Sequence, residues 1–124
     1  MSFSRAVVAG RPALVLDSSG PLLRTEDDAR DLIQETFGSD VRLAVVPVER
    51  LDPEFFVLRT GVAGVFVQKL AQYRLRLAVV GDVSAQTAAS DSLRDWVREV
   101  NRGHDILFVP DIAALEERLN AERP

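Results

Sequence analysis

Hydrophobic residues recur along this chain in two spacings, one typical of strands and the other of helices. Three nearly continuous apolar runs predict strands covered on both faces, residues 41–48 (VRLAVVPV), 75–81 (LRLAVVG) and 105–109 (DILFV). Nearer the start, residues 5–9 and 13–17 flank the turn residues Gly10, Arg11 and Pro12, which predicts two short strands joined as a hairpin.

Apolar positions three and four residues apart predict four helices. Thr25 is expected to cap the first helix and Gly38 to end it, whereas Ser90 and Gly103 bound the third. Pro110 and Asp111 cap the last, and residues 82–89 are expected to form a polar loop. The side chains expected to be buried are Ala29, Leu32, Ile33, Thr36 and Phe37 in the first helix, Leu93, Trp96, Val97 and Val100 in the third, and Ile112, Leu115 and Leu119 in the last.

The second predicted helix, from about residue 60 to residue 73, has two unlike faces. Its broad apolar face, expected to be buried, comprises Val62, Ala63, Phe66, Val67, Leu70 and Tyr73. The opposite face is small and weakly polar and comprises Gly61, Gly64, Val65, Gln68 and Gln72. The two glycines either let the helix pack closely on the sheet or form a contact face for another chain, and both interpretations stay open.

The order of elements, two strands and a helix followed by three strand–helix units, predicts an α/β fold. We expect a mixed, mostly parallel sheet of about five strands with about four helices, joined by right-handed crossovers. The length of 124 residues is typical of one domain, so residues 1–124 are expected to form a single domain.

Composition and charge exclude several kinds of site and partner. The net charge is −4 with both signs interspersed, which disfavours a nucleic-acid backbone or a membrane surface as partner. No cysteine is present and His104 is the only histidine, so no metal site and no cofactor is expected. The opening MSFSRAVVAG lacks the apolar run of a signal peptide, and no stretch reaches membrane-spanning length, so a cytoplasmic location is expected.

Five short segments carry distinctive motifs, namely residues 55–64 (FFVLRTGVAG), 68–70 (QKL) with Tyr73, 77–82 (LAVVGD), 92–95 (SLRD) and 99–103 (EVNRG). Together these motifs closely resemble an uncharacterised bacterial family, domain of unknown function 4180. The resemblance covers most of the chain but implies no activity, because none is established for that family.

The element order also resembles the STAS domain of anti-sigma-factor antagonists. In that fold a Ser-Gly turn opens the second helix, and a partner kinase phosphorylates the Ser. The resemblance implies Thr60 and Gly61 as the equivalent positions, with Thr60 as a possible phosphoacceptor. This chain has Arg59 where STAS domains usually carry an acid, and Val65 where the unknown-function family is expected to carry Glu. Residues 17–20 (DSSG) match the STAS motif in letters only and are expected to form a turn.

The preferred interpretation is a non-catalytic, STAS-like regulatory or protein-interaction module that binds a protein partner or forms a homodimer. Its contact surface comprises Arg59, Thr60, Gly61, Gly64, Val65, Gln68 and Gln72. The alternative is a small enzyme or an anion-binding protein with a site at the carboxyl ends of the strands. That site comprises Arg59, Thr60, Gly81, Asp82 and Arg94, with the arginines holding the ligand and Asp82 acting as acid or base.

Simpler structural roles compete with each of these assignments. Thr60 could only cap its helix, and Gly81 with Asp82 could only form a turn. Arg94, Arg98 and Arg102 have acidic neighbours and are expected to form a solvated helix face. For the motif at 99–103, Asn101 is expected to support the helix end while Glu99 reaches a neighbouring loop. A pocket lined by Asp82 with a raised pKa would favour an enzyme.

Overall fold

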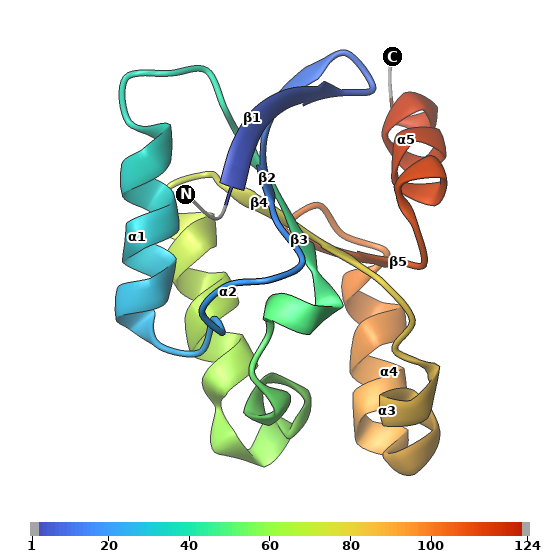
Figure 1. Cartoon of the computed structure of the whole chain (residues 1–124). Coiled ribbons are helices and arrows are strands. Elements are labelled where there is room, and N and C mark those ends of the chain that lie inside the picture. Colours follow the sequence, from blue (N-terminus) through green and yellow to red (C-terminus); the bar gives the residue numbers. More distant parts are fainter. Residues whose placement is uncertain (1–2, 123–124) are drawn as a thin grey trace.

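The computed structural model describes residues 3–122, in which one five-stranded sheet has helices on both faces (Figure 1). The strands lie in sequence order across the sheet; they are β1 (Phe3–Val8), β2 (Arg11–Leu16), β3 (Leu43–Pro47), β4 (Arg76–Val80) and β5 (Ile106–Val109). β1 and β2 form an antiparallel hairpin, whereas every other neighbouring pair is parallel. The predicted mixed, mostly parallel sheet is confirmed.

The described residues contain five α-helices, one more than expected. They are α1 (Glu26–Thr36), α2 (Val62–Gln72), α3 (Ser84–Ala89), α4 (Asp91–Val100) and α5 (Ile112–Ala121). Three short 3₁₀ helices precede α2: η1 (Val48–Arg50), η2 (Pro53–Phe56) and η3 (Leu58–Thr60). The extra helix is α3, which replaces the predicted polar loop because Asp82 accepts a hydrogen bond from the Ser84 amide and three alanines favour the helix that follows.

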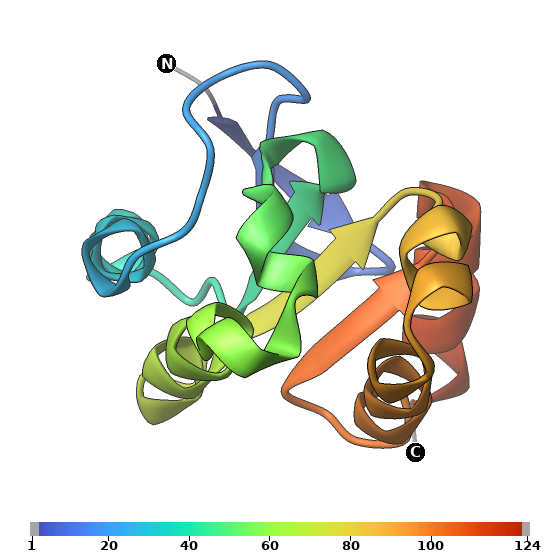
Figure 2. The ribbon, with the colours of Figure 1, turned by 90° about the horizontal axis from the view of Figure 1, so that it is seen from below.

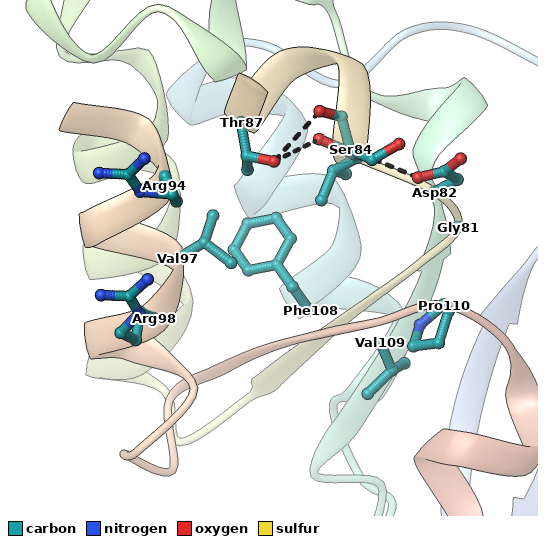
Figure 3. A pocket seen from close by; sticks show the side chains of 11 residues that line it. Gly81, Asp82, Ser84, Thr87, Arg94, Val97, Arg98, Phe108, Val109 and Pro110 are labelled. Carbon is teal, nitrogen blue, oxygen red and sulfur yellow. Dashed lines mark hydrogen bonds between the residues drawn. The ribbon is translucent and has the colours of Figure 1, made fainter. Parts of the chain in front are cut away.

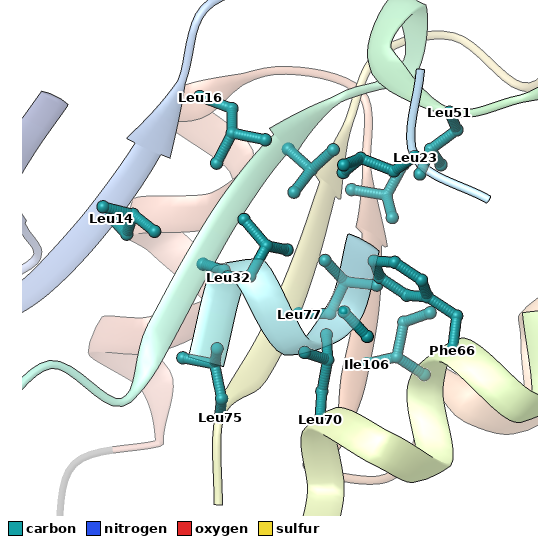
Figure 4. Close-up of a cluster of buried hydrophobic side chains, with 14 of the residues drawn as sticks. Leu14, Leu16, Leu23, Leu32, Leu51, Phe66, Leu70, Leu75, Leu77 and Ile106 are labelled. Carbon is teal, nitrogen blue, oxygen red and sulfur yellow. The ribbon is translucent and has the colours of Figure 1, made fainter. Parts of the chain in front are cut away.

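The larger part of the core lies between the sheet and the helices α1, α2 and α4. Alternate strand residues such as Leu14, Leu77 and Ile106 belong to this core, and Phe66 and Leu70 of α2 lie beside Leu77 and Ile106 (Figure 4). These three helices belong to the crossovers between consecutive parallel strands. Right-handed crossovers that advance in one direction place their helices on one face, as observed here.

The other face of the sheet is covered by α5. Leu115 and Leu119 of this helix pack against strand residues that include Leu43, Ala78 and Leu107. Figures 1 and 2 show α1 and α5 on opposite sides of the sheet. Together the two cores bury the centres of β3, β4 and β5, as their apolar sequences predict, whereas the edge strand β1 is largely exposed.

Three apolar side chains predicted to be buried are exposed instead, and all three lie at helix ends. Phe37 and Tyr73 follow the last turns of α1 and α2, are 65% and 50% exposed, and pack against each other with ring centroids 6.4 Å apart. Ile112 opens α5 before the helix reaches the sheet and is 42% exposed. A helical repeat identifies a face, but it does not say where the neighbouring sheet ends.

A buried arginine that the sequence did not single out organises the loop after β2. Arg50 is only 3% exposed, and it donates from Nε to the Pro21 carbonyl at 2.8 Å and from Nη1 to the Asp17 carbonyl at 3.0 Å. Residues 18–20 between these carbonyls form an exposed bend, as predicted for the DSSG segment.

Candidate functional site

The turn that leads into α2 is tied together by the hydroxyl of Thr60. This oxygen lies 2.8 Å from the Val57 carbonyl and 3.1 Å from the Glu54 carbonyl, and it accepts the Val62 amide at 3.2 Å. The N-cap residue of α2 is Gly61, so the prediction that Thr60 is the cap was wrong by one position. The hydroxyl nevertheless satisfies one of the free amides at the helix start.

The outer face of α2 is exposed as predicted, with Gly64, Val65, Gln68 and Gln72 in contact with solvent. Beside it runs a groove between α2 and α4 of about 380 Å³, the α2–α4 groove. Its lining consists of Gly64, Val67, Gln68, Ala71, Trp96, Val100, Gly103, His104, Asp105 and Ile106. Apolar side chains from three elements therefore line a surface hollow that includes part of the predicted contact face.

Two of the three predicted site glycines have a local structural reason to be glycine, and the third has none. Gly61 has φ +76°, a left-handed conformation that other residues adopt only with strain. A Cβ on Gly81 would lie 2.8 Å from Cγ2 of Val48, so this glycine permits a close approach between chain segments. Gly64 has neither constraint, because a Cβ there would meet nothing within 4 Å. Close packing of α2 on the sheet therefore does not explain Gly64.

A second hollow lies at the carboxyl ends of β4 and β5, where open α/β sheets commonly bind ligands (Figure 3). This carboxyl-edge pocket of about 360 Å³ has an apolar centre around Val97 and Phe108. Its polar lining is Asp82, Ser84, Thr87, Arg94 and Arg98, and Gly81, Val83, Val109 and Pro110 complete it. The predicted residues Gly81, Asp82 and Arg94 thus line one pocket, whereas Ser84, Thr87 and Arg98 were not among the predicted site residues.

The chemistry of Asp82 is that of a turn residue. Its carboxylate accepts the Ser84 amide at 2.8 Å, and hydrogen bonds from the Ser84 side chain and backbone lower the pKa of Asp82. A general acid needs the opposite shift. In Figure 3 the guanidinium groups of Arg94 and Arg98 do not point towards Asp82, and Arg94 has Asp91 and Asp95 within 3.3 and 3.6 Å.

The five residues of the alternative anion site do not line one pocket. Arg59 lines a separate hollow of about 550 Å³ between η2, η3 and the start of α4, together with Phe56, Gln86 and Ser92. Thr60 lines neither hollow. Within residues 3–122, no three side chains of His, Cys, Asp or Glu gather as ligands for a metal ion, and no helix is long and apolar enough to cross a membrane.

No curated protein and no solved structure matches this chain significantly. One protein family does, under the description domain of unknown function (DUF4180), and its match covers residues 8–119. That span contains all elements from β2 to β5 and the three hollows that predicted site residues line. The resemblance read from the motifs at 55–64 and 99–103 is therefore confirmed, and the chain belongs to the DUF4180 family.

Proposed function

We propose that this chain is a non-catalytic, STAS-like regulatory module of the cytoplasm that binds a partner protein, not a nucleic acid or a membrane. The contact surface comprises the turn at Arg59, Thr60 and Gly61 and the outer face of α2, continuing into the α2–α4 groove. The occupant is an uncharged, largely apolar helix of the partner, because the groove runs between two helices and has mainly apolar walls.

The observation that carries this proposal is Gly64. A glycine inside an exposed helix lowers stability by about 1 kcal/mol relative to alanine. Nothing in the packing of the described residues requires it, since no atom lies within 4 Å of the position that its Cβ would take. In the groove it allows the backbone of a neighbouring helix to approach closely, and Gln68 one turn later offers an amide for a hydrogen bond.

Exposed apolar side chains on the same surface support the proposal. Val65 is 49% exposed on α2, and Val57 in the preceding turn is 37% exposed. Val65 follows the groove residue Gly64 in sequence, and Val57 lines the hollow that also contains Arg59. Central apolar contacts surrounded by polar groups are typical of protein interfaces.

The geometry of Thr60 supports a role as phosphoacceptor in the same module. Phosphorylation would remove the hydroxyl hydrogen that the Val57 and Glu54 carbonyls share, and it would place an anion beside both oxygens. The neighbouring Arg59 is exposed and can pair with the phosphate. We expect the modification to loosen η2 and η3 from the start of α2 and so to alter partner binding.

The test is a pull-down from native cytoplasm with wild-type protein, Gly64→Arg and the control Ala113→Arg, which adds the same side chain at an exposed position of α5. Any partner identified by mass spectrometry is then purified and titrated against the three proteins. We expect binding to wild type and Ala113→Arg and at least a tenfold loss with Gly64→Arg. Equal binding by all three proteins would refute the α2 surface, and light scattering that shows a dimer lost in Gly64→Arg would identify a second copy as the occupant.

A second candidate function, binding of a small anion, is supported by the position of the carboxyl-edge pocket and its two arginines. Arg98 has no ion pair among the described residues, so it is available to a ligand. The lowered pKa of Asp82 favours binding over acid catalysis. A metabolite screen by NMR, comparing wild type with Arg98→Gln, tests this function. A ligand that shifts the Ser84 and Thr87 amides only in wild type would support it.

A further inference from the structure

The amino ends of the parallel strands carry a concentration of arginines that neither predicted site uses. A pocket of about 330 Å³, the amino-edge pocket, is lined by Arg11, Arg42, Ala71, Arg74, Leu75, Arg76, His104 and Asp105. These residues lie at or just before the starts of β2, β3, β4 and β5. Because parallel strands begin at the same edge of a sheet, residues distant in sequence meet there.

The charge of this pocket is opposite to that of the chain. The protein has 15 basic and 19 acidic residues, yet four arginines line the pocket and Asp105 is its one acidic lining residue. Among residues 3–122, the Arg42 side chain donates only to the backbone carbonyls of Ser39 and Val41, at 3.2 and 2.7 Å. Neither Arg42 nor Arg74 has a carboxylate partner within residues 3–122. Two guanidinium groups are therefore available to an anion.

The backbone of Arg74 gives an independent reason to assign a role to its side chain. The end of α2 is a Schellman motif, in which Leu75 donates to the Leu70 carbonyl at 3.0 Å and Arg74 to the Ala71 carbonyl at 3.0 Å. Arg74 occupies the position that glycine usually takes and has φ +58°. Arg74 is exposed at the rim of a basic pocket, at a position that favours glycine. The arginine therefore has a conformational cost, which indicates that its charge has a role.

Arg76 forms the fixed part of the pocket. Its two terminal nitrogens donate to the Glu122 carboxylate at 2.7 Å each, which holds the guanidinium in one orientation. Its Nε–H is buried and has no acceptor among the described residues. A buried donor without a partner in the protein is commonly satisfied by a water molecule or an ion. Here the side chain borders the basic hollow.

We propose that the amino-edge pocket binds a small phosphorylated molecule, with Arg42 and Arg74 holding the phosphate groups against the fixed Arg76. Guanidinium groups match phosphate oxygens in charge and geometry, and two or more arginines suit a ligand with at least two negative charges. The volume admits one small ligand. A nucleic-acid site would instead spread its arginines along a stripe.

The proposal is tested with inorganic pyrophosphate as the probe, titrated into ¹⁵N-labelled protein at constant ionic strength. We expect one site, with shifts centred on the amides of residues 42, 74–76 and 104. Arg74→Gly removes the charge while giving the turn its favoured residue, so this variant should fold at least as well as wild type. Arg74→Gly and Arg42→Gln should each weaken binding about tenfold, the loss expected for a charge-assisted hydrogen bond.

The matched control is Arg30→Gln, which removes an exposed arginine on α1. Pyrophosphate binding unchanged by Arg30→Gln but lost in the pocket variants supports the site. Equal weakening of pyrophosphate binding by all three variants would show non-specific attraction and overturn the proposal. Chemical-shift changes confined to amides outside the pocket would overturn it as well. Citrate in place of pyrophosphate tests the ligand class, because tighter binding of citrate would overturn the phosphate assignment. The result of the partner titration does not affect this test, because the two experiments use different variants.

Discussion

The side-chain amide of Asn101 pairs with both backbone groups of Phe108, as a neighbouring strand would. Its Nδ2 donates to the Phe108 carbonyl at 3.2 Å, and its Oδ1 accepts the Phe108 amide at 2.7 Å. Phe108 lies in β5, which is the last strand of the sheet and has one unpaired edge. Asn101 is the C-cap residue of α4, so one residue ends a helix and covers part of an exposed strand edge.

Replacement of Asn101 by Ala should lower the free energy of unfolding by about 1–3 kcal/mol, because two part-buried backbone groups lose their partners. Asn101→Asp keeps only the acceptor and should lie between wild type and Asn101→Ala. Urea unfolding measures both, with Asn120→Ala at an exposed position as control. Equal stability of Asn101→Ala and the control would show that water replaces the amide without cost.

Arg50→Met should destabilise the protein by about 2–4 kcal/mol, since the carbonyls of Asp17 and Pro21 would lose a buried charged donor. The loop after β2 should also become more sensitive to protease. Arg102→Met, at a side chain that is 72% exposed, is the control and should change stability by less than about 0.5 kcal/mol. A stable Arg50→Met protein with an unchanged loop would contradict this role.

Stability should fall in acid through Glu122. The hydrogen bonds and charge of Arg76, followed by those of Arg118, lower the pKa of Glu122 from 4.5 to about 2. A carboxyl whose pKa is lower in the folded state stabilises fully above the unfolded value, and this stabilisation is lost as pH falls from about 4.5 towards 2. Its size is at most about 3 kcal/mol. Unfolding measured against pH should show a smaller acid dependence in Glu122→Gln, whereas Glu116→Gln on the same helix should behave as wild type.

Gly61, the N-cap residue of α2, and Gly64 within the helix should respond to alanine in opposite directions. Gly64→Ala should raise stability by about 0.5–1 kcal/mol, because the new methyl group meets no atom and alanine favours the helix. Gly61→Ala should lower it by about 1–2 kcal/mol because of the left-handed backbone. Thermal unfolding of both variants measures the contrast. Destabilisation by Gly64→Ala would show that the glycine serves the fold, which would remove the main support for the α2 surface.

The fold could be predicted because each strand is a compact apolar run and each long helix has a clear apolar face. The burial of residues such as Leu77 in β4 and Leu93 in α4 can be predicted from the apolar pattern of the sequence around them. Predictions failed where the packing of distant segments, and not the local sequence pattern, determines burial or secondary structure. Tyr73 lies past the edge of the core, and α3 forms in a segment with no apolar repeat.

The predicted site residues lie in separate groups in the structure. Gly64 and Gln68 share one hollow, and Gly81, Asp82 and Arg94 share another, but Arg59 lies elsewhere. The basic pocket was missed because Arg11, Arg42 and the pair Arg74 and Arg76 lie about 30 residues apart in the sequence and meet only through strand pairing. Glu99 pairs at 3.7 Å with Arg102, which lies in the turn directly after the C-cap of α4, and among residues 3–122 it has no ion pair with a more distant loop.

The strand order has a consequence for synthesis on the ribosome. Each strand pairs with the one made just before it, so the sheet can grow in the order in which the chain emerges, and helices α1, α2 and α4 cover one face as it grows. The opposite face, with Leu43, Ala78 and Leu107, stays uncovered until the ten residues of α5 have been synthesised. A nascent chain that stalls before α5 therefore presents an apolar sheet surface, and exposed apolar surface of this kind promotes aggregation of an unfinished protein.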